Sequence, residues 1–258
     1  MTEASPLLEV RQIEKRFGGV VALSGVSLSI RNREIYGLIG PNGAGKTTLF
    51  NVLTGLYAPE HGELLFDGVS FRGLAPHLVV ERGIARTFQN IRLFGNMTAL
   101  ENVMVGRHVR THAGLLGAIL RGARARDEER AILRRAVALL DYVGIGRHAQ
   151  ALSRNLPYGD QRRLEIARAL ATEPRLLALD EPAAGMNSTE TAELRALLER
   201  IRADGTTILL IEHDVKLVMG LCDRVAVLDN GNKIAEGGPA TVQKDPAVIQ
   251  AYLGGALP

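Results

Sequence analysis

One segment constrains this chain more than any other: residues 40–47, which read GPNGAGKT. They match the pattern G-x-x-x-x-G-K-[ST], which is typical of loops that bind nucleotide phosphates. The apolar run 35–39 before them predicts a short buried strand, and residues 47–53 predict the start of a helix. A strand, a glycine-rich turn and a helix in this order favour a phosphate-binding loop over a chance glycine-rich turn.

The residue types of this loop explain how it would bind phosphate. The glycines let the backbone turn its N–H groups toward one point, and the helix N-terminus adds partial positive charge there. We expect Lys46 to reach the β- and γ-phosphates and the Thr47 hydroxyl to ligate Mg²⁺. The predicted nucleotide contacts are Gly40, Pro41, Asn42, Gly43, Ala44, Gly45, Lys46, Thr47 and Thr48.

A phosphate loop alone does not identify the nucleotide, because GTPases share it. GTPases usually add a DxxG element and an NKxD sequence that reads the base. Residues 141–144 fit DxxG, but they lie where the sequence predicts the end of a helix, and no NKxD follows. We therefore interpret the DxxG match as chance.

Composition sets broad limits on the class of protein. The 258 residues, 46% of them hydrophobic, suit one substantial core or one core with a lobe. A net charge of +3 is too small to indicate binding to nucleic acid. The single cysteine, Cys222, excludes an intrachain disulfide and is expected to be a small buried hydrophobe. No signal peptide is visible, and the most apolar run, 114–120, is too short to cross a bilayer, so we expect membrane association only through partners.

The order of the predicted elements indicates an α/β fold with a helical insertion. A β-rich first part is followed by a helical stretch from about 99 to 171 and then by alternating strands and a helix over 189–201. This alternation predicts a mostly parallel sheet flanked by helices. The expected strands are 7–10, 26–30, 35–39, 63–66, 176–179, 207–211 and 225–228.

These elements predict a single domain over residues 1–258. Its nucleotide-binding α/β core is expected to combine residues 1–90 and 172–258, with an antiparallel β subdomain near the N-terminus. A helical subdomain is expected at about 91–171.

A second strong pattern is the run 176–181, in which four apolar residues end in Asp180 and Glu181. It predicts a buried strand whose carboxyl end delivers Asp180 to the edge where open α/β sheets bind ligands. Asp180 is expected to hold Mg²⁺, directly or through water, and Glu181 to polarise the attacking water as general base. Alone, the pattern also fits a strand followed by an acidic turn; the phosphate loop upstream favours the catalytic interpretation.

Residues 156–162 read LPYGDQR and are followed by the helical pattern RLEIARAL. With the two motifs above, they resemble the ATP-binding subunit of an ABC transporter, over nearly the whole chain from about 7 to 253. The family's signature is usually LSGGQ. The resemblance implies an ATPase that uses ATP and Mg²⁺, and contacts from the signature to a nucleotide held by a facing subunit. The signature residues concerned are Leu156, Tyr158, Gly159, Asp160 and Gln161.

The resemblance gives roles to three further residues. Phe17 lies where an aromatic residue stacks on adenine, although a core phenylalanine at a strand end remains an alternative. Gln89, within RTFQN, matches the glutamine loop, which touches Mg²⁺ or water and faces the membrane partner. His213, within IEHD, matches the switch histidine that contacts the γ-phosphate, although an isolated histidine after a strand is usually structural.

Two residues depart from the family pattern. Pro157 replaces the signature serine and offers neither a hydroxyl nor a backbone N–H to phosphate. Asn187 replaces the aspartate common in the loop that crosses to the other subunit. The change at Pro157 puts in doubt how strongly this chain's signature binds the nucleotide held by the facing subunit.

Longer strings resemble one branch of the family, the larger ATP-binding subunit of the bacterial high-affinity branched-chain amino acid importer. This resemblance implies two permease subunits, a second ATPase subunit in a heterodimer (or a homodimer in isolation), and indirectly a periplasmic or extracellular solute-binding protein. It also implies a peripheral position on the cytoplasmic face of the bacterial inner membrane. Urea importers, lipopolysaccharide exporters and soluble ABC ATPases remain alternatives. The strings are 86–94, 114–126, 158–168, 180–187, 211–219 and 249–254.

Overall fold

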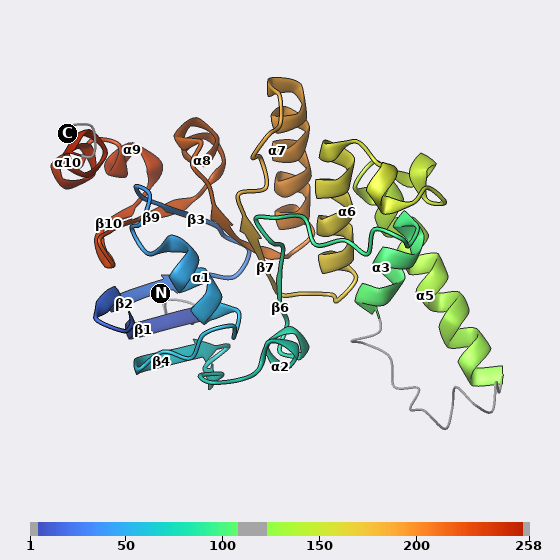
Figure 1. Ribbon diagram of the computed structural model, residues 1–258, viewed down its shortest axis with the longest axis horizontal. Coiled ribbons are helices and arrows are strands. Elements are labelled where there is room, and N and C mark those ends of the chain that lie inside the picture. The colour runs from blue at the N-terminus through green and yellow to red at the C-terminus, as the bar shows by residue number, and fades with distance from the viewer. Residues whose placement is uncertain (1–4, 108–122, 255–258) are drawn as a thin grey trace. The chain divides into compact units, whose positions relative to one another are not determined.

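The computed structural model describes residues 5–107 and 123–254. The chain forms two compact units: a core unit of residues 1–86 and 175–258, and a helical unit of residues 87–174 (Figure 1). Most of the segment 114–126, which resembles an insert of the family, lies outside the described residues.

A six-stranded, mostly parallel sheet forms the centre of the core unit, as predicted. Its strands lie in the order β10-β9-β3-β8-β7-β6, and only the β10–β9 pair is antiparallel. Two of them escaped prediction, because β6 has only three residues and β10 has no fully buried one. Their bounds are β3 Ile35–Ile39, β6 Ile84–Arg86, β7 Leu176–Asp180, β8 Thr207–Ile211, β9 Arg224–Asp229 and β10 Asn232–Gly237.

A four-stranded antiparallel sheet with the order β2-β1-β4-β5 makes up the predicted β subdomain. Its first two strands are longer than expected, because irregular pairing in β1 interrupts the alternation of buried and exposed residues after Val10. Gln12 lies at this irregularity with φ 50°, and its backbone N–H donates to the Ser27 hydroxyl at 2.8 Å. The bounds are β1 Leu8–Phe17, β2 Val20–Ile30, β4 His61–Phe66 and β5 Val69–Ser70.

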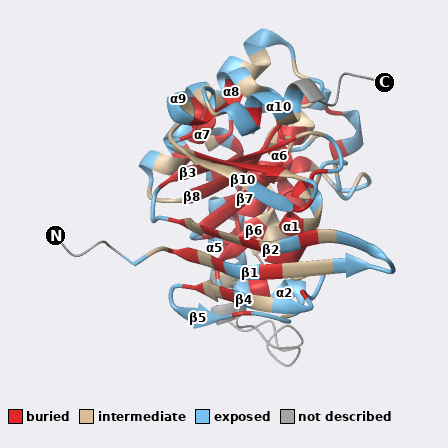
Figure 2. Cartoon of the chain, turned by 90° about the vertical axis from the view of Figure 1, so that its left-hand side faces the viewer, coloured by how far each residue is buried: buried red, intermediate tan, exposed pale blue. Residues whose placement is uncertain are grey.

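Alternate residues of the six-stranded sheet face two different layers. Leu38, Leu209 and Ile211 join the main hydrophobic core with the antiparallel sheet and α1. Figure 2 shows the buried parts of the strands in red. On the other face Gly37 packs against α8 and Cys222, where burial raises the pKa of the thiol to about 12. The helices are α1 Lys46–Leu53, α2 Pro76–Glu81, α7 Ser188–Ala203, α8 Val215–Leu221, α9 Pro239–Val242 and α10 Pro246–Gly254.

The helical unit is built on α3 (Ala99–Arg107), α5 (Ala123–Tyr142) and α6 (Tyr158–Leu170). Two short 3-10 helices, Gly146–His148 and Ser153–Asn155, connect α5 with α6. The DxxG match at 141–144 is a helix end, as interpreted from the sequence, with φ 83° at Gly144. No helix in the described part of the chain is both long and apolar enough to span a membrane.

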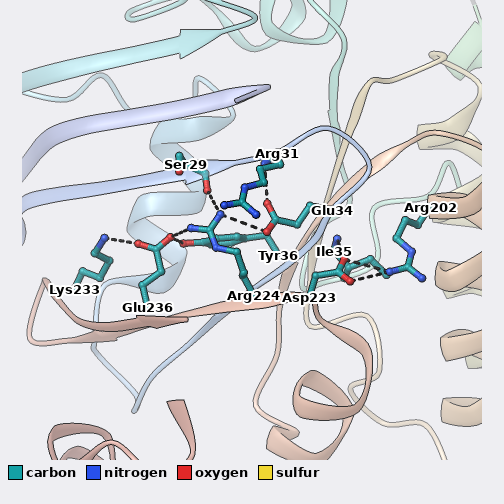
Figure 3. A network of polar contacts seen from close by, with 10 residues as sticks. All are labelled: Ser29, Arg31, Glu34, Ile35, Tyr36, Arg202, Asp223, Arg224, Lys233 and Glu236. Carbon is teal, nitrogen blue, oxygen red and sulfur yellow. Dashed lines mark hydrogen bonds and ion pairs between the residues drawn. The ribbon is translucent and has the colours of Figure 1, made fainter. Parts of the chain in front are cut away.

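A polar network fixes the amino end of β3, the strand that leads into the phosphate loop (Figure 3). The Arg224 guanidinium lies 5.3 Å from the Tyr36 ring centroid and donates to the Ser29 carbonyl at 3.2 Å. It also bonds Glu236, which accepts a 2.7 Å hydrogen bond from the Tyr36 hydroxyl, and Glu34 at 3.4 Å. These partners come from β2, β9 and β10 and their neighbouring turns. The network therefore joins both sheets near the amino end of β3.

Candidate active site

The sheet register brings three predicted site segments to one edge of the core unit. Ile211, the last residue of β8, pairs with both Leu38 of β3 and Asp180 of β7. Since these strands are parallel, their carboxyl ends meet at the same edge. Three segments therefore start next to one another at this edge: the phosphate loop, the acid pair Asp180–Glu181 and the turn that carries His213.

The loop 40–45 has the shape that its sequence predicts, and two glycines are required by the space around them. A Cβ at Gly40 would lie 2.1 Å from the Leu228 carbonyl oxygen. Gly45 has φ 102°, and a Cβ there would lie 2.7 Å from the Ala22 carbonyl oxygen. Only glycine permits this approach of the loop to β2 and β9.

Lys46 begins α1 and is only 6% exposed. Its ammonium group donates to the carbonyl oxygens of Gly40 at 2.7 Å and Pro41 at 2.9 Å. Burial lowers the pKa of Lys46, while the charges of Glu181 and Asp180 act in the opposite direction. The lysine of the loop thus lies within the field of both predicted catalytic acids.

The residues predicted to hold Mg²⁺ in the core unit offer oxygen ligands only. Asp180 ends β7 and is 2% exposed, and Thr47 follows Lys46 in the first turn of α1. A carboxylate and a hydroxyl next to a phosphate-binding loop are ligands that Mg²⁺ prefers, together with phosphate oxygens and water. The donor set therefore fits this ion.

Glu181 and His213 form a close pair. The Glu181 Oε1 and His213 Nε2 atoms lie 2.6 Å apart, and the Glu181 side chain is 12% exposed. Glu181 has φ 49°, an uncommon conformation for a non-glycine residue, and its N–H donates to the Ile211 carbonyl at 2.8 Å. Backbone strain of this kind occurs at functional sites, where the surrounding structure holds the residue in place.

Glu212, which immediately precedes His213 in the sequence, was not predicted as a site residue and is 4% exposed. Its carboxylate accepts hydrogen bonds from the N–H of Ala183 at 2.7 Å and of His213 at 3.2 Å. Glu212 therefore links the turn after β7 to the turn after β8. An acid next to His213 was the only available signal, since Ala183 is 29 positions away.

The environment of Glu212 predicts a stability that depends on pH. Burial, helped by the charge of Glu181, raises the pKa of Glu212 above its ordinary value, so the folded chain binds this proton more tightly than the unfolded chain. The resulting stabilisation is present below the ordinary pKa and is lost as pH rises through the raised pKa. Glu212→Gln cannot titrate at this position. As pH rises from about 5 to about 8, the free energy of unfolding of this variant should therefore increase relative to that of the unaltered chain. The urea midpoints of the variant and of the unaltered chain at both pH values measure this change. If the difference between the two midpoints is the same at both pH values, the prediction is contradicted.

Phe17 lies at the end of β1 and is 44% exposed, so it is not a core residue. Its ring meets the Tyr57 ring edge-on, with centroids 5.2 Å apart, and the Lys15 ammonium lies 5.2 Å from its centroid. The stacking of Phe17 on adenine stays a prediction, and an accessible aromatic ring is compatible with it.

Gln89 and the signature belong to the helical unit. Tyr158, Gly159, Asp160 and Gln161 form the first turn of α6, and the buried Leu156 precedes this helix by two residues. Pro157 is the N-cap residue of α6, and its carbonyl accepts a hydrogen bond from the Gln161 N–H at 2.9 Å. The first N–H groups of a helix have no partner within it, so this turn can still face an anion despite the proline.

Asn187 has a structural role that its departure from the family pattern did not suggest. It is the N-cap residue of α7, and its side chain accepts from the N–H groups of Thr189 at 2.9 Å and Glu190 at 3.0 Å. The Glu190 carboxylate in turn accepts a hydrogen bond from the Asn187 N–H at 2.9 Å, which completes a capping box.

The core unit brings a buried loop lysine, an acid pair and a histidine to the carboxyl edge of a parallel sheet, and comparisons with known proteins identify the class of this chain as an ATP-binding cassette. A sequence profile described as "ABC transporter" matches residues 23–184, and one described as "Branched-chain amino acid ATP-binding cassette transporter" matches residues 232–257. The chain is 48% identical, over 254 residues, to the high-affinity branched-chain amino acid transport ATP-binding protein LivG of Salmonella typhimurium (98% of this chain, 100% of the relative). It is 45% identical, over 252 residues, to the corresponding protein BraF of Pseudomonas aeruginosa (97% and 99%).

Solved structures agree with this class. The ADP conformation of an ATP-binding cassette from an ABC transporter has a TM-score of 0.85 and 31% identity, covering 97% of this chain and 100% of that chain. A dimeric cassette bound to ADP and phosphate has a TM-score of 0.77 and 26% identity, covering 90% and 98%. The chain belongs to the ABC transporter family, as an ATP-hydrolysing subunit.

Proposed function

We propose that this ATPase powers the import of branched-chain amino acids. The observation that carries the cargo assignment is the 48% identity to LivG over nearly the full length of both chains. The profile match at 232–257 supports it independently, because that segment lies outside the general cassette match at 23–184.

ATP hydrolysis would follow from the geometry of the core unit. Lys46 would exchange its two carbonyl acceptors for the β- and γ-phosphates, and the loop N–H groups would bind the same phosphates. Thr47 and Asp180 would hold Mg²⁺, which supplies positive charge against the phosphate oxygens. Phe17 would stack on adenine.

Glu181 would act as general base on the attacking water. Its Oε1 lies 2.6 Å from His213 Nε2, a contact that holds the carboxylate in place, and the carboxylate would orient the water and accept its proton. His213 is 46% exposed in its side chain and would also contact the γ-phosphate. Gln89 would contribute to the water and metal contacts from the helical unit.

Two ATPase subunits would face each other head to tail, with ATP bound by the loop of one and the signature of the other. The similarity to a dimeric cassette supports this arrangement. Leu156, Tyr158, Gly159, Asp160 and Gln161 would then contact the neighbour's nucleotide. Because Pro157 lacks both donors of a serine, the site completed by this signature would be the weaker one, which favours a second, different ATPase subunit.

ATP would close this pair because it binds the closed state more tightly than the open one, and hydrolysis would reset it. The closing and opening of the ATPase pair would be transmitted to two permease subunits. A periplasmic or extracellular solute-binding protein would deliver the cargo to them. The ATPase would lie peripherally on the cytoplasmic face of the bacterial inner membrane. A urea importer, a lipopolysaccharide exporter and a soluble ABC ATPase are the alternatives that the experiment must separate.

The test is to isolate the chain with its partners from gently solubilised native membranes and to identify them by mass spectrometry. Two polytopic permeases, a second ATPase and an amino-acid-binding protein are expected. A urea-binding protein in place of the amino-acid-binding protein would contradict the cargo. An export-type permease pair without a binding protein would contradict import, and the absence of membrane partners would contradict transport.

A further inference from the structure

One side of α6 carries three charged residues at a spacing of three: Arg162, Glu165 and Arg168. The Arg162 and Glu165 side chains are only 4% and 1% exposed and form an ion pair with a 3.2 Å separation. Burial raises the pKa of Glu165 and lowers the pKa of Arg168. Buried charges are costly, and apolar residues of similar volume often stabilise a fold as well or better. Helix packing alone therefore does not explain this pair.

These charged residues bind the backbone of the glutamine-loop segment, residues 88–92. Arg162 Nη1 donates to the Phe88 carbonyl at 2.8 Å, and Nη2 donates to the Gln89 carbonyl. Glu165 Oε1 accepts from the Arg92 N–H at 2.9 Å, and Arg168 donates to the Arg92 carbonyl. Both ends of the segment are thus fixed to α6 through its main chain.

The same guanidinium also reaches the signature. Arg162 Nη2 lies 2.9 Å from the Tyr158 hydroxyl, and the guanidinium carbon lies 5.3 Å from the Tyr158 ring centroid. One buried side chain therefore bonds both Gln89 and a signature residue.

We propose that Arg162 and Glu165 are positioning residues for ATP hydrolysis, which hold the glutamine-loop backbone, and with it Gln89, to the signature helix. This inference rests on the proposed function, because it needs a role for Gln89 in the reaction. Gln89 is exposed, and the bond from Arg162 to its carbonyl limits where its amide can point. A misplacement of about 1 Å at a catalytic group can cost about a hundredfold in rate.

The test compares Arg162→Met/Glu165→Leu with the unaltered chain in the full transporter complex. Removing both charges avoids leaving Arg162 or Glu165 buried without the other, which could unfold a single variant. Arg168, which lies 3.9 Å from Glu165 and is 17% exposed, keeps its bond to the Arg92 carbonyl. We expect amide exchange in residues 88–92 to increase at least about tenfold. We also expect kcat for MgATP to fall at least about tenfold while KM stays within about twofold. Arg163→Met is the matched control: this arginine is next on α6 but donates to the Val143 carbonyl instead, and neither readout should change.

A second comparison separates positioning from general damage. In a Gln89→Ala background, the double substitution should reduce kcat little further, because its effect acts through Gln89. Full additive loss in that background, or unchanged exchange in residues 88–92, would overturn the inference and leave the proposed function intact. An unaltered complex that fails to hydrolyse ATP, or normal kcat in Gln89→Ala alone, would overturn the proposed catalytic role itself.

Discussion

Glu181→Gln is expected to reduce ATP hydrolysis by at least about a hundredfold while ATP binding is retained. The substitution preserves the size of the side chain, so the turn after β7 and its bond to the Ile211 carbonyl should survive. An amide cannot accept the proton of the attacking water, and its pairing with His213 at 2.6 Å loses the negative charge. Initial rates at saturating MgATP and calorimetric titration with ATP measure the two properties separately.

Glu199→Gln is the matched control for this result. Glu199 lies on α7 with 46% of its side chain exposed, 3.1 Å from Arg195, and its loss should leave hydrolysis unchanged. Normal hydrolysis in Glu181→Gln would remove Glu181 as the general base. Loss of ATP binding in the same variant would instead indicate that the carboxylate supports the shape of the site.

The sequence predicted the parts of the site that depend on adjacent residues. The strand before the phosphate loop has the expected bounds, 35–39, because a short apolar run followed by glycines leaves few other structures. The helix after the loop was expected from Thr47 for the same local reason, and it begins one residue earlier, at Lys46. Asp180 at the end of β7 was predicted as well, because four apolar residues followed by an acid describe a buried strand that reaches an edge.

Contacts between distant residues were not predicted. Glu212 gains its role from Ala183, 29 positions earlier, and Arg162 from Phe88, 74 positions earlier. No local pattern marks such pairs, and the sequence alone does not distinguish a buried charged residue from an exposed one. Asn187 differs: Asn187 and Glu190 are spaced as a capping box, so its helix-capping role had a local signal that was overlooked.

Lys46→Ala is expected to weaken ATP binding by about 3 kcal/mol, or on the order of a hundredfold, because two hydrogen bonds from a charged donor to phosphate are lost. The fold should tolerate the change. Burial already lowers the pKa of Lys46, so removing its charge also removes a cost of burial, which offsets the loss of its bonds to Gly40 and Pro41. Titration in a Glu181→Gln background, where turnover is slow, measures the affinity.

Thermal unfolding gives an independent measure of the same loss. A ligand that binds only the folded chain stabilises it by RT ln(1 + [L]/Kd), so ATP at about a hundred times the original Kd contributes about 2.7 kcal/mol. After a hundredfold loss of affinity, the same ATP concentration contributes only about 0.4 kcal/mol, and most of the ATP-induced rise in Tm should disappear. Lys244→Ala, which removes an exposed lysine near α9, should keep the full rise. A full rise in Lys46→Ala as well would mean that the loop N–H groups alone bind the phosphates.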